Sequence, residues 1–250
     1  MKIGDIEITF REILICIIIT LILVGLGFLI STGIKNGISE NNEKYYKSLK
    51  INNNEEQFKY AIKTNIGYVL AEGKVQAKDG VSIADIEGTY FYIRKEKEEY
   101  TMHTRQVEHT RTKSDGTTGT YYTTEEYWTW DYVGKEEFNT EKFNFLGVDF
   151  DYETIKFSNT EYLETKDGGY HIRYKYYVIP FEFEGTLFTY INDNTINDNT
   201  FSNNKTIDNI IQKKQDEENT DTAIFWIIWI IAIEFIDFGY VSLDNYYLED

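Results

Sequence analysis

The sequence has few of the residues that build covalent and metal-centred sites. Its 250 residues include one cysteine, Cys16, one proline and three histidines. A single cysteine excludes an internal disulfide and any cysteine-based zinc cluster. Basic residues are also in the minority, since 25 lysines and arginines against 42 aspartates and glutamates give a formal net charge of −17. Because a phosphate backbone repels carboxylates, this balance argues against nucleic acid as a partner.

Familiar catalytic motifs are missing as well. The chain has no Gly-x-Ser-x-Gly elbow, no phosphate-binding glycine loop and no His-Glu-x-x-His helix. His103 and His109 would face the same side of one strand but lie about 20 Å apart, too far for one metal ion. His171 follows a turn and has no partner nearby in the sequence. The repeated Ile-Asn-Asp-Asn-Thr at 191–200 lacks the spacing and closing glutamate of a calcium loop. We therefore expect no enzyme activity, no cofactor and no metal.

The first long apolar run covers residues 13–30 and carries no charge. As a helix it would be about 27 Å long, close to the thickness of a bilayer core. It is too long for most signal-peptide cores and has no strong cleavage site after it. We predict an N-terminal tail at 1–12 and an uncleaved transmembrane helix at 13–31, with a buried helix of a soluble protein as the alternative. Gly27 and Ser31 form a small-xxx-small pair that could let another helix approach.

A second apolar run, at 223–241, is interrupted by Glu234 and Asp237. Each acid near the middle of a bilayer costs about 2.5–3.5 kcal/mol, while each large apolar residue returns about 0.3–0.6 kcal/mol, so insertion is marginal. We predict a second transmembrane helix here, with a helix lying in the interface or packed on the protein as the alternative. Trp226, Trp229 and Tyr240 suit a headgroup boundary in either case.

The two acids of this run are three residues apart and would share one helix face. Ionisable groups inside a membrane suggest ion or proton passage, which would make the chain a small transport or channel-like component using Glu234 and Asp237. The sequence favours the simpler interpretation that both acids lie near the far interface without a chemical role. A partner helix or an oligomer could also satisfy them.

The region between the two runs is predicted to be mainly β, since it is rich in β-branched and aromatic residues. A polar helical linker at 32–65, with a helix start at 54–56, leads into a β domain at 66–191. Candidate strands lie at 66–77, 88–95, 99–113, 119–133, 152–157, 170–179 and 185–191, with Asp-Gly turns at 79–80, 115–116 and 167–168. Pro180 indicates a strand break or an edge. A low-complexity linker with a short helix at 192–222 and an acidic tail at 242–250 complete the chain.

The clearest unit is a long hairpin that runs out over 100–113, turns at 114–119 and returns over 120–132. Trp128, Trp130 and Tyr132 alternate along the return strand, so one face carries three aromatic side chains. The sequence favours the interpretation that this face covers the domain core. The alternative is a surface for a protein partner or for the membrane.

Part of this β region resembles a known family. The similar residues are Glu72-Gly73-Lys74-Val75, then 88–94, Arg105-Gln106-Val107-Glu108, the Asp115-Gly116 turn and Tyr127-Trp128-Thr129-Trp130. Over about 66–140 the chain resembles the transmembrane protein 43 (LUMA) family and, more distantly, the membrane-adjacent domain of GIDE-type ubiquitin ligases. No RING cysteines follow, so ligase activity does not carry over. The resemblance implies a membrane-associated scaffold with its β domain outside the cytoplasm.

Positive charge suggests the opposite orientation. Lys2 and Arg11 precede the first run, whereas four lysines closely follow it, at 35, 44, 47 and 50, and three closely precede the second run, at 205, 213 and 214. The sidedness of the domain therefore stays open. Taken together, the sequence predicts an integral, two-pass membrane protein whose partners are the lipid bilayer and a protein partner or a second copy of itself. Its expected role is non-enzymatic, either interaction or structure.

Overall fold

The computed structural model describes residues 2–3, 6–7, 9–114 and 116–248. The chain divides into two compact units, which are described separately. A helical unit holds Met1–Lys50, Gly67–Leu70 and Thr206–Asp250, and a β unit holds Ile51–Ile66 and Ala71–Lys205. The expected architecture is confirmed, because antiparallel sheets are flanked in sequence by two long apolar helices, with a short helix in the connection.

The helical unit consists of α1 (Phe10–Tyr46) and α3 (Ile207–Leu248), preceded by the short antiparallel pair β1 (Lys2–Ile3) and β2 (Ile6–Glu7). Thr9 begins α1 with a capping box, in which its side chain accepts from the backbone N–H of Glu12 and the Glu12 carboxylate accepts from the backbone of Thr9. Each helix is longer than its apolar run. At 37 and 42 residues they measure about 55 and 63 Å, roughly twice the thickness of a bilayer core.

Both helices are long and apolar enough to cross a membrane. In the most apolar 18-residue stretch of each helix only 6% of residues are buried, so the rest of the protein leaves their apolar side chains uncovered. A helix in the core of a soluble protein is mostly buried, so this exposure is compatible with a membrane anchor.

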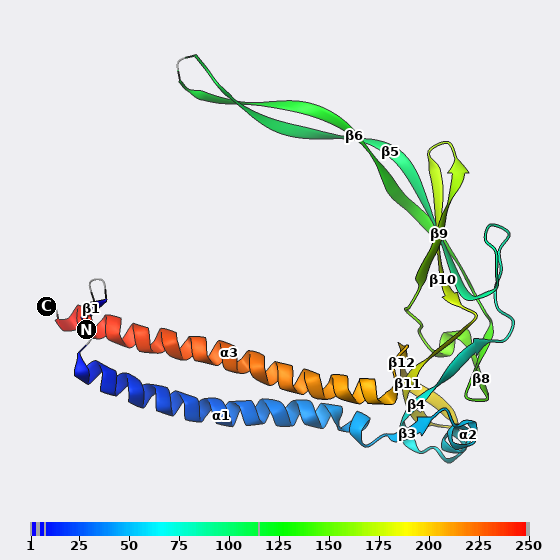
Figure 1. Cartoon of the computed structure of the whole chain (residues 1–250), viewed down its shortest axis with the longest axis horizontal. Helices are drawn as coiled ribbons and strands as arrows, with labels where there is room; N and C mark the ends of the chain where they lie inside the picture. The colour runs from blue at the N-terminus through cyan, green and yellow to red at the C-terminus, as the bar shows by residue number, and fades with distance from the viewer. Residues whose placement is uncertain (1, 4–5, 8, 115, 249–250) are drawn as a thin grey trace. The chain divides into compact units, whose positions relative to one another are not determined.

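α1 and α3 lie side by side and run antiparallel (Figure 1). At one end the Arg11 guanidinium donates to Asp244 over 2.5 Å. At the other end the carboxylate of Glu218 accepts from the Asn42 amide over 3.1 Å and from the Tyr46 hydroxyl over 2.7 Å. These contacts continue the pairing past the apolar runs, which explains why the polar residues 32–46 and 207–222 are helical.

The β unit contains two antiparallel sheets. In the first, the strand order is β12 (Thr195–Asn203), β11 (Glu182–Asn192), β4 (Gly67–Ala77), β7 (Lys142–Phe145) and β8 (Val148–Asp151), and β3 (Leu49–Asn52) pairs with β4. The second has the order β6 (Thr118–Asn139), β5 (Tyr90–Thr112), β10 (Ile172–Pro180) and β9 (Glu161–Gly169).

Phenylalanine fills the core of this unit. The helix α2 (Glu55–Thr64), capped by the Asn54 side chain as the sequence predicts, buries Phe58 completely. The ring of Phe58 meets Phe145 edge-on at 5.4 Å between centroids, and Phe91 meets Phe157 in the same way at 4.9 Å. Edge-to-face pairs of this kind add to the apolar burial that holds the helix against the strands.

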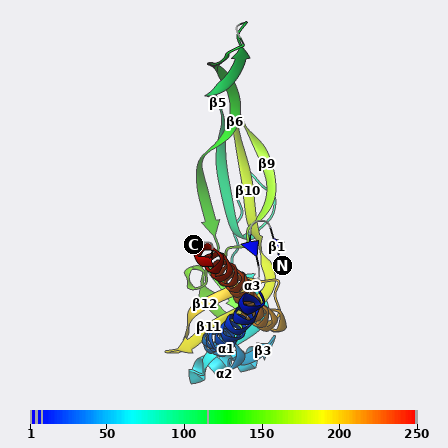
Figure 2. The same ribbon diagram turned by 90° about the vertical axis from the view of Figure 1, so that its left-hand side faces the viewer.

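The long hairpin is the most extended element of the second sheet (Figure 2). β10 pairs with β5 only from Tyr90 to Glu99, so the outer part of β5 pairs with β6 alone. We call the two-stranded part, Tyr100–Thr112 with Thr118–Trp130, the arm. Thirteen residues per strand make it about 44 Å long. The register confirms the predicted hairpin. Of its predicted Asp115-Gly116 turn, Asp115 lies outside the described residues, as do 1, 4, 5 and 8 of the N-terminal tail and 249–250 of the acidic tail.

Several predicted elements were wrong. The repeat at 191–200 is not a linker, because 195–203 form β12, which pairs with β11 and buries Ile196. The asparagines and aspartates of the repeat are typical of loops, and the segment is a strand because it pairs with β11. The strand expected at 152–157 is instead the 3₁₀ helix η1 (Tyr152–Thr154). The predicted break at Pro180 is confirmed, since β10 ends there after a register shift.

Candidate functional site

The arm presents two different faces, because residues directly opposite each other in the register project to the same side. One face carries Tyr100 opposite Trp130 and Met102 opposite Trp128. The other carries His103 opposite Tyr127 and Arg105 opposite Glu125. The predicted grouping of Trp128, Trp130 and Tyr132 on one face agrees with this register.

Four rings gather where the arm leaves the four-stranded sheet, and we call them the aromatic platform: Tyr100, Trp128, Trp130 and His171. The ring of Tyr100 stacks on Trp128 at 5.3 Å between centroids and lies 5.1 Å from Trp130. His171 meets Trp128 edge-on at 5.2 Å and Tyr100 at 5.6 Å. Next to the platform, Tyr170 stacks on His171 at 4.0 Å and is 88% exposed.

His171 reaches the platform through a tight turn. β9 and β10 pair Gly169 with Ile172, which leaves Tyr170 and His171 as a two-residue loop. His171 has φ of +58°, and its carbonyl accepts from the backbone N–H of Tyr100 over 2.9 Å. This bond fixes the loop against the base of the arm and turns the imidazole toward Trp128.

The inner edge of the platform is held by charge. The Arg173 guanidinium lies over the Trp130 ring, 4.2 Å from its centroid, and its Nε donates to Glu98 over 2.5 Å. Lys175 donates to the other oxygen of Glu98 over 2.8 Å. Burial of Glu98 acts to raise its pKa, but the two cationic donors outweigh it and the pKa lies below its ordinary value. Arg173 thus holds the Trp130 ring in place, while the Trp128 side chain remains exposed to solvent.

The structure overturns the expectation that this aromatic face covers the core. Trp128 is 46% exposed and Tyr132 57% exposed, and Trp130 is half-buried. The described residues of the β unit therefore leave Trp128 and Tyr132 largely uncovered. Sequence reasoning grouped Trp128, Trp130 and Tyr132, but it missed Tyr100 and His171. Their proximity depends on the register between β5 and β10, which joins segments about seventy residues apart and has no local pattern.

The histidines lie apart, as expected from their spacing. On the opposite face of the arm His103 lies 2.5 Å from the Asp131 carboxylate, and His109 lies 2.7 Å from the Thr123 hydroxyl. Hydrogen bonds from Thr129 and from His103 lower the pKa of Asp131. In the described part of the chain, no group of three histidine, cysteine or acidic side chains could hold a metal ion.

The two acids of α3 have different surroundings. Asp237 turns toward α1, and one of its carboxylate oxygens accepts from the Thr20 hydroxyl over 2.7 Å. Its other oxygen, Oδ1, is buried without a hydrogen-bond partner. Glu234 is exposed, and among the described residues its carboxylate has neither a hydrogen bond nor an ion pair. The two residues therefore do not act as a pair within one chain.

The close approach of the helices depends on Gly27. A Cβ atom there would lie 2.5 Å from Nε1 of Trp229 and 3.1 Å from the Trp226 ring. The Trp229 indole donates to the backbone carbonyl of Leu23 over 3.0 Å. Ser31 is also buried, at 8% exposure. The predicted small-xxx-small contact is confirmed, with a tryptophan seated on the glycine.

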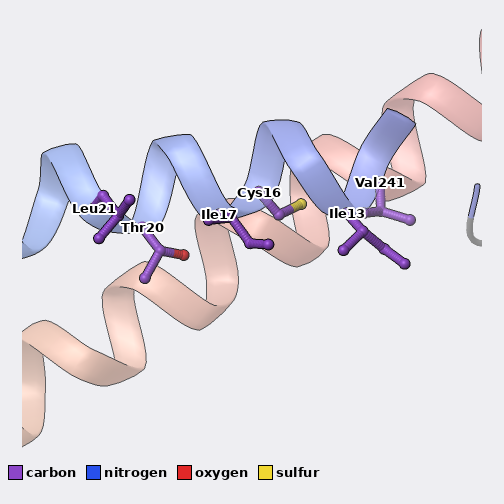
Figure 3. Close-up of a pocket in the computed structure, with 6 residues that line it drawn as sticks. All are labelled: Ile13, Cys16, Ile17, Thr20, Leu21 and Val241. Atoms are coloured by element: carbon purple, nitrogen blue, oxygen red, sulfur yellow. The ribbon is translucent and has the colours of Figure 1, made fainter. Parts of the chain in front are cut away.

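An apolar groove of about 400 Å³ lies beside the Asp237 contact (Figure 3). Its lining comes from one face of α1 and from Val241 of α3, and comprises Ile13, Cys16, Ile17, Thr20, Leu21 and Val241. The only polar side-chain atoms of that lining are the Cys16 thiol and the Thr20 hydroxyl. Such a lining suits hydrocarbon better than a charged or strongly polar ligand.

The aromatic platform and the polar contacts of the helix pair are the two features from which function can be inferred. The first is an exposed cluster of large rings fixed at its base. The second is the contact of Asp237 with Thr20, together with the exposed Glu234 on the same apolar helix. Comparison of the whole chain with protein-family models, curated proteins and solved structures gave no significant match.

Proposed function

We propose that this protein is a membrane-anchored, non-enzymatic interaction protein that presents its arm and aromatic platform to a protein partner beside the bilayer. The single observation that supports this most is the exposure of the platform, since large rings held in place yet open to solvent are typical of the centre of a protein interface. The resemblance to the transmembrane protein 43 family, with its implied scaffold role, agrees with this proposal.

The arm itself also favours an interaction role. A two-stranded ribbon is at best marginally stable in water, and this one continues for about 44 Å without a third strand. Among the described residues, the edge of β5 that faces away from β6 has no paired strand beyond Tyr100, whose backbone N–H bonds the His171 carbonyl. A protein that maintains such an exposed edge gains a surface to which another chain can add a strand.

The test is a quantitative pull-down of the full-length protein from a detergent extract. We expect Trp128→Ala to lose the partner that the wild type retains, since truncating a central aromatic residue typically costs 2 kcal/mol or more of binding free energy, about thirtyfold in affinity. Tyr122→Ala is the matched control, because Tyr122 is an exposed aromatic residue on the same face, at 62% against 46% for Trp128, but lies farther out along the arm and outside the aromatic platform. Equal recovery with both variants would contradict the proposed role of the platform.

A further inference from the structure

The position of Glu234 along the helix pair can be read from contacts on either side of it. Asp237 bonds Thr20, and Trp229 bonds the carbonyl of Leu23 and covers Gly27. Glu234 lies between Trp229 and Asp237 on α3, so in an antiparallel pair it is level with the stretch between Thr20 and Gly27. That stretch contains the midpoint of the uncharged run 13–30 of α1. If the helices span a bilayer, Glu234 is therefore near its middle.

Glu234 projects from a side of α3 that does not face α1, so its carboxyl group finds no hydrogen-bond partner there. Its side chain is exposed, and nothing in the described chain bonds it. The uncharged run opposite it supplies no cation. A carboxyl group exposed to lipid near the bilayer centre costs about 2.5–3.5 kcal/mol on insertion scales. Such a group is normally satisfied by another helix, so its exposure indicates that something covers this face.

The residues around Glu234 form a stripe with the spacing of a helix–helix interface. Ile224, Ile227, Ile231, Glu234 and Phe238 follow each other at intervals of three, four, three and four residues, and all five are exposed. This is the heptad spacing of the a and d positions, which packs membrane helices at a small left-handed crossing angle. A single polar residue within such a stripe fixes the register and the number of helices.

We propose that this stripe is the interface through which two copies of the chain associate in the membrane, with Glu234 facing Glu234 of the second copy. A protonated carboxyl group donates as well as accepts, so two identical residues that share a proton across a two-fold axis satisfy each other. No residue of different chemistry is needed, and the apolar side chains of the stripe meet their own equivalents. The proposal rests on the membrane anchoring proposed above but not on the platform.

Disulfide crosslinking of the full-length protein in phosphatidylcholine vesicles tests the interface. In a Cys16→Ser background, Ile231→Cys places a thiol on the stripe, and Ile236→Cys places one on an exposed face well away from it. We expect oxidation to give a covalent dimer several-fold faster with Ile231→Cys. Equal rates at both positions would overturn the proposal, and so would an adduct of Ile231→Cys to a different protein in native membranes.

Glu234 itself is tested by comparing Glu234→Leu with Glu234→Gln in a self-association assay in the same vesicles. Because leucine favours insertion more than glutamate does, a loss of dimer in Glu234→Leu cannot come from failure to enter the membrane. We expect Glu234→Leu to weaken self-association about tenfold, the size of one interhelical hydrogen bond in a membrane, and Glu234→Gln to retain most of it. An undiminished dimer in Glu234→Leu, or a monomeric wild type, would contradict the proposal.

Extraction with alkaline carbonate separates the two proposals. Release of the wild-type protein from the vesicles would contradict the membrane anchoring itself. Retention of the protein together with equal crosslinking at Ile231→Cys and Ile236→Cys would contradict self-association alone.

Discussion

The backbone of Gly27 lies directly under the indole of Trp229, and the absence of a side chain at Gly27 is what lets Trp229 reach the carbonyl of Leu23. We expect Gly27→Leu to separate the helices locally and to destabilise the helix pair by about 1–3 kcal/mol, the usual range for overpacking a close contact. The free energy of unfolding in detergent, followed by circular dichroism, measures this effect.

Gly25 provides the control for that experiment. It lies in the same apolar run, but a Cβ atom there would have no neighbour within 4 Å. Gly25→Leu should therefore leave the stability of the helix pair unchanged or slightly improved, since leucine is also the better helix former. Equal losses of stability from both substitutions would show that the close contact between Gly27 and Trp229 is not the reason for the glycine.

Glu98 is the buried charge on which the base of the platform depends. Its side chain is 12% exposed and bonds both Arg173 and Lys175, and its pKa is lowered in the folded protein. We expect Glu98→Gln to cost about 1.5–3 kcal/mol near neutral pH, the contribution of hydrogen bonds to charged groups. Chemical unfolding of the full-length protein in detergent measures the difference.

The same substitution predicts a pH dependence. Since the pKa of Glu98 is lower when the protein is folded, its contribution to stability is fully present above the ordinary carboxylate value of about 4.3 and is lost as the pH falls toward the folded value. The stability difference between wild type and Glu98→Gln should stay constant above about pH 5 and shrink below about pH 4. A difference that grows in acid would contradict this linkage.

A grouping of side chains could be predicted from the sequence only where its members lie close together on one helix or strand. Gly27 and Ser31 stand four apart on one helix, so their common face could be predicted without knowing what covers it. Trp128 and Trp130 alternate on one strand, so their common side could be predicted too. His171 and Tyr100 meet only because β10 pairs with β5 in a particular register, and no local spacing encodes that pairing.

At the scale of elements, the arm should be separable from the fold beneath it. Replacing 105–125 with Asn-Gly would join Thr104 to Glu126, which are already paired, through a two-residue turn of the favoured type. Because the strand residues removed pair only with each other, and the contact given up with the retained part is that of Arg105 over the Tyr127 ring, we expect the melting temperature to change by no more than about 3 °C, which corresponds to less than about 1 kcal/mol for a protein of this size. Differential scanning calorimetry in detergent measures it.

Trp130→Ala gives the contrasting result for that experiment. It leaves the arm at full length but removes the ring under Arg173 and beside Tyr100, so we expect a larger fall in melting temperature than from the shortened arm. A shortened arm that unfolds the β unit would mean that the outer residues support the sheet.

Both helices show why element boundaries were harder to predict than element types. The apolar runs were located correctly, and helical segments were expected within 32–65 and 192–222, but as separate linker elements and not as continuations of the two long helices. Residues 32–46 and 207–222 are helical because the pairing continues through Asn42, Tyr46 and Glu218. Burial and the bond to Glu218 raise the pKa of Tyr46 to about 12, so its hydroxyl remains a neutral donor across the physiological range. The pairing between the two helices, and not a local pattern, sets their length.

For the whole molecule, the net charge of −17 is distributed unevenly with respect to the helices. No basic residue follows Lys214, and residues 233–250 contain five acids, Glu234, Asp237, Asp244, Glu249 and Asp250. The basic residues beside the apolar runs are concentrated on the side of the β unit. The positive-inside rule then favours a cytoplasmic β unit, whereas the family resemblance implies the opposite side. The side of the membrane on which the β unit lies therefore decides where any partner of that unit must be.

The antiparallel pairing of α1 and α3 makes this sidedness measurable. Since the start of α1 lies beside the end of α3, two complete spans would place the residues before and after the helix pair on one side of the bilayer and the arm on the other. In a Cys16→Ser background, single cysteines at Lys2 and Leu248 should react with an impermeant thiol reagent from the same side, and a cysteine at Gly116 only from the opposite side. Reaction of the cysteines at Gly116 and Leu248 from one side and of the cysteine at Lys2 from the other would mean that α1 crosses the membrane and α3 does not. In that case Glu234 would face water or a headgroup and would not need a second copy to satisfy it. The labelling pattern therefore decides the sidedness of the arm and whether the interface around Glu234 can form.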